Sequence, residues 1–336
     1  MANPITGALR AADRFQKRHR WLSVTYAVVK KFGEDRAGNL AALIAYYGFF
    51  SLFPLLLVLV SILGLVLRGN PELRQSILHS ALLQFPVIGD QLQQNIDSLT
   101  KGNGVPLGIG IIGTLWAGLG VVKSLEEALN TVWDVPYKRR PNAIYSSLRA
   151  LLMLAVLGVM TLLSALVAGA GAGSHALWWA AVGSLMSLVI NFGLFLLAFK
   201  ILTTADVSWA DIRPGAVVGA VGWTALQAVG GFYVSRQLKG ATQVYGTFAV
   251  VIGLLAWLYL GARLTMYAAE LNVVVRKRLW PRSLVTPPFT EADERALKRL
   301  AKVEERHEQE RVDAELDENA TESGMEGKPD DVKAAG

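Results

Sequence analysis

The chain has 336 residues, of which 52% are hydrophobic and only 18% are charged, whereas soluble domains carry about 25% charged residues. This composition excludes an ordinary soluble domain, and the absence of cysteine excludes disulfides and thiolate chemistry. The net charge of +6 does not indicate nucleic-acid binding, because Lys and Arg cluster at the ends of apolar runs, where membrane topology requires them.

Long uncharged runs predict the membrane-spanning part of the chain. They cover residues 39–67, 102–122, 150–199, 214–235 and 240–262. A helical span needs about 20 predominantly apolar residues, and the run over 150–199 is long enough for two spans separated by the flexible stretch AGAGAGSH. We therefore expect an all-α, polytopic membrane protein whose six transmembrane helices form a bundle within residues 39–280.

Residues 1–38 form a basic segment with eight Lys and Arg, and Arg276, Lys277 and Arg278 directly follow the last predicted span. The positive-inside rule places both regions, and therefore both termini, in the cytoplasm. Within 1–38, apolar side chains recur at helical spacing, which favours an amphipathic helix on the anionic inner membrane surface. A solvated basic leader is the alternative.

Two further segments lie outside the predicted spans. The first outer loop has apolar spacing typical of two short amphipathic helices, which we expect to cap the outer face. The tail over 281–336 is charged, and Thr290 followed by Asp293 indicates a capping box that opens a helix to about Leu316. The acidic end has a disordered composition. The tail either aids solubility or binds a partner.

The first predicted span carries polar residues and a proline at membrane depth. Pro54 cannot donate a backbone hydrogen bond to the carbonyl of Phe50. Ser51 is close enough to help satisfy this carbonyl, and another helix could supply the rest. Tyr46 and Tyr47 each place a phenol where it requires a partner. Two interpretations remain. Tyr46, Tyr47, Ser51 and Pro54 form either an interfacial aromatic belt with a tolerated kink, or a polar half-helix that shapes a cavity or hinge.

Three stretches resemble a known family. AALIAYYGFFSLFPLLL (41–57) closely resembles the signature of the YihY/BrkB family of bacterial inner-membrane proteins. WAGLGVVKSLEEALNTVWDV (116–135) and YGTFAVVIGLLAWLYLGARLTMYAAELN (245–272) resemble two further family segments, although the family usually has Gly where this chain has Ala268. The resemblance implies a six-helix bundle in the bacterial inner membrane without a defined biochemical activity. A former ribonuclease label for the family is regarded as a mistake.

The residues themselves test the ribonuclease label. Metal-dependent RNA cleavage needs His and carboxylate ligands clustered around one or two metal ions, but the histidines are scattered, at His19, His79, His175 and His307. The stretch GTLWAGLGVVKS lacks the Gly-Lys-Ser of a phosphate-binding loop, and no Gly-x-Ser-x-Gly elbow is present. We therefore expect no enzyme activity, no catalytic or metal site, no cofactor and no nucleic-acid partner.

Polar residues gather at the cytoplasmic end of the second predicted span. Lys123, Glu127 and Asn130 share one helix face, and Glu126 lies beside that face. Charges at this depth are costly unless they are paired or snorkel to the headgroups. The pattern indicates either snorkelling with a structural ion pair or a polar vestibule along a substrate path.

The last predicted span carries polar residues at a similar depth. Arg263 and Glu270 lie on one side of this helix, and Asn272 closes its Glu-Leu-Asn end. Arg263 matches Glu126 or Glu127 in depth, since each lies a similar number of residues from the start of its span. We expect an ion pair between Arg263 and one of these carboxylates, because the planar guanidinium suits a carboxylate.

These features favour transport or handling of a lipid-like or other amphiphilic envelope substrate. A kinked polar span and polar helix ends, in a chain without catalytic constellations, support this hypothesis. The alternative is a non-transporting scaffold that supports envelope integrity. A carrier requires a substrate-sized polar cavity, whereas a scaffold is closed and packed. Membrane lipids are expected partners in both cases.

Overall fold

The computed structural model describes residues 4–66, 105–171, 177–233, 247–286 and 288–315. Apart from a 3-10 turn at Tyr137–Arg139, every regular element among these residues is an α-helix. The helices are α1 (Pro4–Arg18), α2 (Arg20–Glu34), α3 (Ala37–Val66), α6 (Val105–Val132), α7 (Ala143–Gly171), α8 (Leu177–Leu202), α9 (Trp209–Tyr233), α11 (Thr247–Lys277) and α12 (Glu291–Val303). The predicted all-α class is confirmed.

Six of the described helices are long enough to cross a bilayer. The helices α3, α6, α7, α8, α9 and α11 have 25 to 31 residues each, and a span needs about 20. Apolar windows of spanning length within the described residues are Ala143–Met160, Leu185–Leu202 and Val251–Lys277. The chain is a polytopic helical membrane protein. Its six-span count stays a prediction, and the two amphipathic helices of the first outer loop lie outside the described residues.

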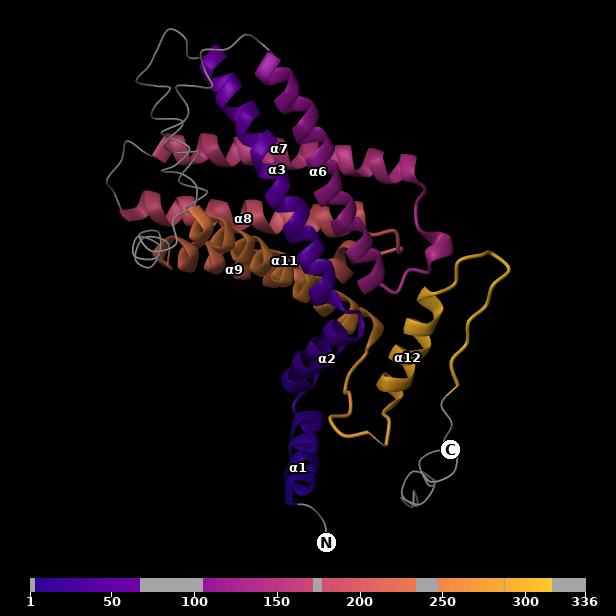
Figure 1. The fold of residues 1–336 in the computed structure, drawn as a ribbon. Helices are drawn as coiled ribbons and strands as arrows, with labels where there is room; N and C mark the ends of the chain where they lie inside the picture. Colours follow the sequence, from indigo (N-terminus) through magenta and orange to yellow (C-terminus); the bar gives the residue numbers. More distant parts are fainter. Residues whose placement is uncertain (1–3, 67–104, 172–176, 234–246, 287, 316–336) are drawn as a thin grey trace, which may run out of the picture.

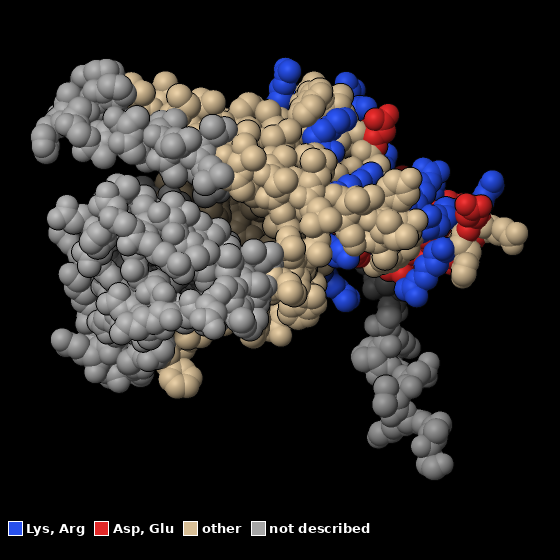
Figure 2. All heavy atoms as spheres, turned by 90° about the horizontal axis from the view of Figure 1, so that it is seen from above, with Lys and Arg blue, Asp and Glu red and all other residues tan. Residues whose placement is uncertain are grey.

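The helices α3 and α6 run side by side, and α11 contacts both of them (Figure 1). The helices α7 and α8 contact α6, and α9 packs against α8 and α11. The helices α1, α2 and α12 lie beyond the bundle and run across the direction of α8 (Figure 1). Figure 2 shows that Lys, Arg, Asp and Glu gather at one end of the described surface. A membrane-crossing bundle has such a charged end, because ionised side chains are costly in hydrocarbon.

Close contacts between helices occur where α3 carries bulky side chains opposite glycines of α6. A Cβ built at Gly113 would lie 2.9 Å from Cβ of Pro54, and one built at Gly120 would lie 2.7 Å from Cδ1 of Tyr47. Real Cβ atoms avoid contacts below about 3 Å because of steric repulsion. Both glycines therefore let α3, including its proline, pack directly against the backbone of α6.

The buried core lies toward the charged end of the bundle. It is formed by apolar residues of α2, α3, α6, α7, α8, α9, α11 and α12, among them Ala27, Ala41, Leu129, Val132, Met266 and Val273. Phe32 of α2 stacks on Tyr267 of α11 with ring centroids 4.1 Å apart. This core fixes the positions of the helix ends that carry the polar residues.

The charged tail begins with the predicted capping box but forms a shorter helix than expected. The Thr290 hydroxyl accepts a hydrogen bond from the backbone N–H of Asp293, whose side chain accepts one from the N–H of Thr290. The helix α12 ends at Val303 and not near Leu316. The chain turns there because Glu305 pairs with Lys138 at 2.7 Å and its carbonyl accepts a hydrogen bond from the Lys138 N–H.

Candidate functional site

A polar pocket of about 370 Å³ lies between α3, α6 and the start of α7. Its lining combines apolar residues from α3 with polar residues from α6 and from the connection that follows it. The lining residues are Leu43, Tyr47, Gly120, Lys123, Ser124, Glu126, Glu127, Asn130, Arg140, Pro141 and Ser146. The structure thus brings Tyr47 together with the four polar residues that the sequence placed on the second span.

The α-helical period explains why one stretch of α6 supplies the polar side of the pocket. Lys123, Glu127 and Asn130 follow one another at four and three residues, a spacing that keeps side chains on one helix face. Gly120 is one turn earlier, where the ring of Tyr47 occupies the space that a side chain would need. The Tyr47 ring therefore forms a wall of the pocket.

The carboxylates of the pocket are paired with basic residues of the same region. Arg140 forms an ion pair with Glu127 and stacks over Tyr137, with Cζ 4.1 Å from the ring centroid. Glu126 is 3% exposed, accepts a hydrogen bond from the Ser146 hydroxyl, and lies 3.6 Å from the Arg149 guanidinium. Both negative charges are therefore neutralised by neighbouring groups.

Lys123 differs from the other charged residues of the pocket. It is half-buried, and no carboxylate lies within ion-pairing distance of it among the described residues. Neighbouring Asn130 is 1% exposed, and its side-chain oxygen accepts a hydrogen bond from the Thr204 N–H at 2.8 Å. Asn130 therefore joins α6 to the α8–α9 loop, whereas Lys123 faces the pocket without a carboxylate partner among the described residues.

The four residues singled out on the first span take different positions. Tyr47 lines the pocket, whereas Tyr46 is 54% exposed. The Ser51 hydroxyl donates a hydrogen bond to the carbonyl of Gly48 at 2.7 Å. The expectation that it helps to satisfy the carbonyl of Phe50 is therefore wrong. Pro54 packs against Gly113 of α6. The predicted cavity is therefore built around Tyr47, and whether Pro54 acts as a hinge stays a prediction.

The expected ion pair between Arg263 and Glu126 or Glu127 is not present. Arg263 donates to the Tyr267 hydroxyl at 3.3 Å, and its guanidinium lies 5.4 Å from the ring centroid of Phe32. The two carboxylates are paired with α7 and the α6–α7 connection instead. The prediction was wrong because matching depth does not determine which way a side chain faces around the helix axis.

Glu270 and Asn272 lie away from the pocket, in the interior of the charged end. The Asn272 side-chain oxygen accepts a hydrogen bond from the Gly215 N–H at 2.6 Å, which joins α11 to α9. Glu270 is fully buried and lies 3.7 Å from the ammonium of Lys31. Sequence reasoning missed Lys31 as a buried partner. Its spacing of four residues from Asp35, which predicts a helical pair, was the available signal.

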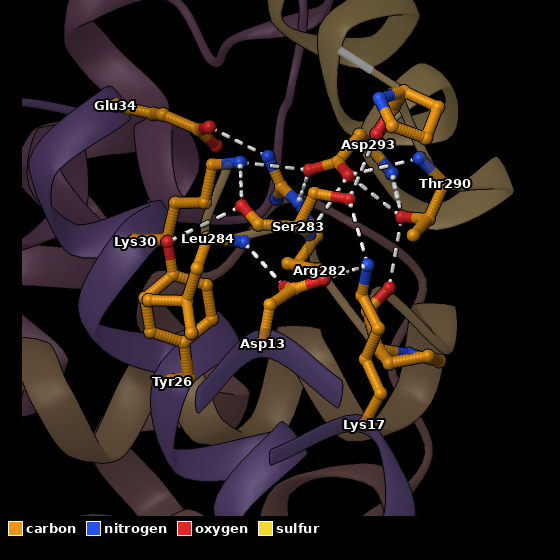
Figure 3. A network of polar contacts seen from close by, with 12 residues as sticks. Asp13, Lys17, Tyr26, Lys30, Glu34, Arg282, Ser283, Leu284, Thr290 and Asp293 are labelled. Carbon is orange, nitrogen blue, oxygen red and sulfur yellow. Dashed lines mark hydrogen bonds and ion pairs between the residues drawn. The ribbon is translucent and has the colours of Figure 1, made fainter. Parts of the chain in front are cut away.

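A second polar network joins the N-terminal helices to the tail (Figure 3). In this network, called the tail latch below, Asp293 accepts from Arg282 at 2.6 Å and from Lys30 at 2.8 Å. Arg282 also donates to Glu34 at 2.6 Å. Burial by itself raises the pKa of Asp293, but its hydrogen bonds outweigh burial and hold that pKa well below its usual value.

The sequence is similar to one protein family and to several individual proteins. The family described as Virulence factor BrkB matches residues 28–290. The chain is 26% identical over 263 residues to the putative ribonuclease-like protein YfkH of Bacillus subtilis, covering 71% of this chain and 90% of that protein. It is 25% identical over 257 residues to the inner membrane protein YhjD of Escherichia coli, covering 70% of this chain and 76% of that protein.

Longer relatives extend beyond this chain. It is 26% identical over 268 residues to a UPF0761 membrane protein of Pseudomonas paraeruginosa, covering 77% of this chain but only 64% of that protein. No solved structure gives a significant match.

Proposed function

Because this chain belongs to the virulence factor BrkB family, whose relatives include membrane proteins, we propose that it transports or handles an anionic, lipid-like amphiphile of the bacterial envelope. The observation that carries the proposal is the pocket of about 370 Å³ between α3 and α6, which joins an apolar wall to Lys123, a lysine without an ion-pair partner in the described part of the chain. The head group of the amphiphile binds in this pocket.

The chemistry of the pocket supports a ligand with one charged and one apolar end. Lys123 supplies a charge-assisted hydrogen bond to an anionic head group. The wall formed by Leu43 and Tyr47 continues along α3, where Tyr46 and Phe50 are exposed. An acyl chain lying along these residues would stay in the hydrocarbon layer while the head group contacts α6.

The size and place of the pocket fit a head group. Ligand pockets commonly have volumes of about 300–1,000 Å³, and about 370 Å³ lies at the small end of that range. The pocket is lined by the charged residues Lys123, Glu126, Glu127 and Arg140, the last of which belongs to the basic cluster Lys138–Arg140. Such basic clusters mark the cytoplasmic side of a membrane protein. Within this proposal the protein sits in the inner membrane with both termini cytoplasmic and takes its ligand from the inner leaflet.

A scaffolding role is the second candidate, and the tail latch favours it. Arg282 is 1% exposed and binds both Glu34 and Asp293, so it fixes α12 to α2 (Figure 3). A rigid cytoplasmic face of this kind suits a docking platform for other envelope proteins. The two candidates differ in whether the pocket holds a ligand.

A ribonuclease activity is not part of the proposal. The ribonuclease-like name belongs to YfkH of Bacillus subtilis, and RNA hydrolysis of the metal-dependent kind needs clustered ligands. No group of three or more His, Cys, Asp or Glu side chains is placed to hold a metal ion within the described ranges. We therefore expect the purified protein not to degrade RNA with any divalent metal.

Mass spectrometry of the amphiphiles that co-purify with the protein in native nanodiscs tests the proposal. The wild-type protein should be enriched in an anionic amphiphile relative to the surrounding membrane. Lys123→Gln should reduce this enrichment about tenfold to a hundredfold, because one charge-assisted hydrogen bond contributes about 1.5–3 kcal/mol.

The control is Lys298→Gln, which removes an exposed lysine of α12 outside the pocket and should leave the enrichment unchanged. A wild-type lipid profile equal to that of the bulk membrane would contradict the proposal and favour the scaffold. Equal enrichment in the wild-type and Lys123→Gln proteins would show that the amphiphile binds outside the pocket.

A further inference from the structure

Four charged side chains meet in the interior where α2, α6 and α11 join. The ammonium nitrogen of Lys31 lies 2.5 Å from Oδ2 of Asp35, 3.1 Å from Oδ1 of Asp134 and 3.7 Å from Oε2 of Glu270. Each side chain is at most 4% exposed. These four residues, called the buried cluster below, do not line the polar pocket.

The charges of the buried cluster do not balance if every carboxyl group is ionised. One ammonium lies within 4 Å of three carboxylates, and Lys277 at the end of α11 adds a positive charge that acts on Asp134. Arg263 is directed to aromatic rings instead. Buried carboxylates without a countercharge or donor are strongly disfavoured, so a proton or a cation must compensate the excess.

The surroundings of Glu270 indicate which of these is present. The carboxyl groups of Asp35 and Glu270 face the same ammonium, at 2.5 Å and 3.7 Å from the nitrogen of Lys31. Two ionised carboxylates offer only acceptors, so a hydrogen bond between them requires that one carboxyl group carries a proton. If both are ionised, neither oxygen of Glu270 has a hydrogen-bond donor within the described part of the chain, although the side chain is fully buried.

A bound metal ion is the other way to compensate the charge, and the arrangement of the carboxyl groups does not favour it. Among the described residues, no group of three or more acidic or His side chains is placed to hold a metal ion. The ammonium of Lys31 already occupies the point at which the three carboxyl groups converge. A proton needs no such space.

We propose that the buried cluster is a proton-binding site in which Asp35 and Glu270 share one proton at neutral pH. Burial raises the pKa of Asp35 to about 6, so the ionised form of this carboxyl group is less favoured than that of an exposed aspartate. Loss of the proton places two adjacent negative charges between the α2–α3 turn and α11. Their repulsion weakens the contact between these elements, so the site couples protonation to helix packing without involving the pocket ligand.

Infrared spectroscopy of the full chain in lipid nanodiscs tests this proposal. The wild-type protein at about pH 7 should show the carbonyl stretch of a buried, protonated carboxylic acid, which shifts in D₂O. Glu270→Gln and Asp35→Asn should each remove this band, because the introduced amide supplies its own donor and the remaining carboxyl needs no proton. Asp211→Asn, which changes an acidic residue at the start of α9, should leave the band unchanged.

If Glu270→Gln does not fold, the infrared spectrum of the wild-type protein is sufficient to test the proposal. Absence of the carboxylic acid band from the wild-type protein at about pH 7 would overturn the proposal. A band that persists in Asp35→Asn would place the proton elsewhere and would equally overturn it. The wild-type protein could instead lack this band and become more thermally stable as Na⁺ is added at fixed pH. That result would overturn the proposal and show that a metal cation compensates the excess negative charge.

Discussion

The ring of Tyr47 in α3 lies against Gly120 in α6 so closely that a Cβ at position 120 would be 2.7 Å from Cδ1 of the ring. This contact brings the two helices together at the pocket and sets the position of the pocket wall. It also makes the packing sensitive to a single methyl group, because an added atom forces either the ring or the helix to move.

Gly120→Ala should therefore destabilise the protein by about 1–3 kcal/mol, the usual cost of overpacking, and should weaken ligand retention by displacing Tyr47. Thermal unfolding in detergent measures the first effect. The matched control is Gly158→Ala on α7, where an added Cβ has no neighbour within 4 Å. That change should be neutral or stabilising by about 0.5–1 kcal/mol. Equal stability of the two variants would show that the Tyr47–Gly120 contact is not tight.

The positions of the long helices were predictable from the sequence, and their side-chain partners were not. Absence of charge over 39–67 predicts α3, because hydrocarbon excludes unpaired charges and requires a helix to satisfy the backbone. The polar face with Lys123 follows from the helical period alone. The partner of Arg263 does not follow from the helical period. The direction in which Arg263 points depends on the rotation of α11 about its axis, and only tertiary packing fixes this rotation.

The tail latch should be the strongest link between the tail and the N-terminal helices. Arg282→Met retains most of the side-chain volume but removes the cation of Glu34 and one of the two cations of Asp293, which keeps Lys30. Removing one partner of a buried pair costs up to about 3–5 kcal/mol. We expect α12 to become accessible to protease before the bundle unfolds, which limited proteolysis with mass mapping would detect.

Arg295→Met is the control for the latch. Arg295 is 46% exposed and pairs with Glu291 at 3.4 Å on the surface of α12, and such pairs contribute about 0–1 kcal/mol. Protease sensitivity should remain close to that of the wild-type protein. If Arg282→Met is as resistant as Arg295→Met, the latch does not hold the tail.

The latch should also fail in acid. The pKa of Asp293 is lower in the folded protein than the value of about 3.9 for an unperturbed aspartate. The stabilising contribution of a carboxyl group with a lowered pKa is complete above about pH 4 and is lost as the pH falls toward the lowered pKa. Below about pH 4 the wild-type protein should lose the stabilisation that ionised Asp293 provides. Asp293→Asn lacks this stabilisation at every pH.

Thermal unfolding measured between about pH 3 and about pH 7 compares the two proteins in this range. The difference between their unfolding temperatures should shrink toward acid, whereas Glu291→Gln, which removes a 90% exposed carboxylate, should parallel the wild type. A constant difference between wild type and Asp293→Asn would show that ionised Asp293 does not stabilise the fold.

Reporter fusions test the proposed topology. Fusions after Arg140 and after Lys277 should report the cytoplasm, because both follow clusters of Lys and Arg. A fusion after Gly102 should report the external side. An external signal after Arg140 would exclude both the six-span arrangement and a pocket open to the inner leaflet.

Photo-crosslinking from the pocket wall tests most directly whether the pocket between α3 and α6 holds an anionic amphiphile. A photoreactive residue in place of Leu43, which lines the pocket, should capture anionic amphiphiles selectively, and Lys123→Gln should abolish this selectivity. The same residue in place of Leu185, 63% exposed on α8, should capture bulk lipid whether or not Lys123 is present. Capture of bulk lipid alone at both positions, unaffected by Lys123→Gln, would contradict the proposed function.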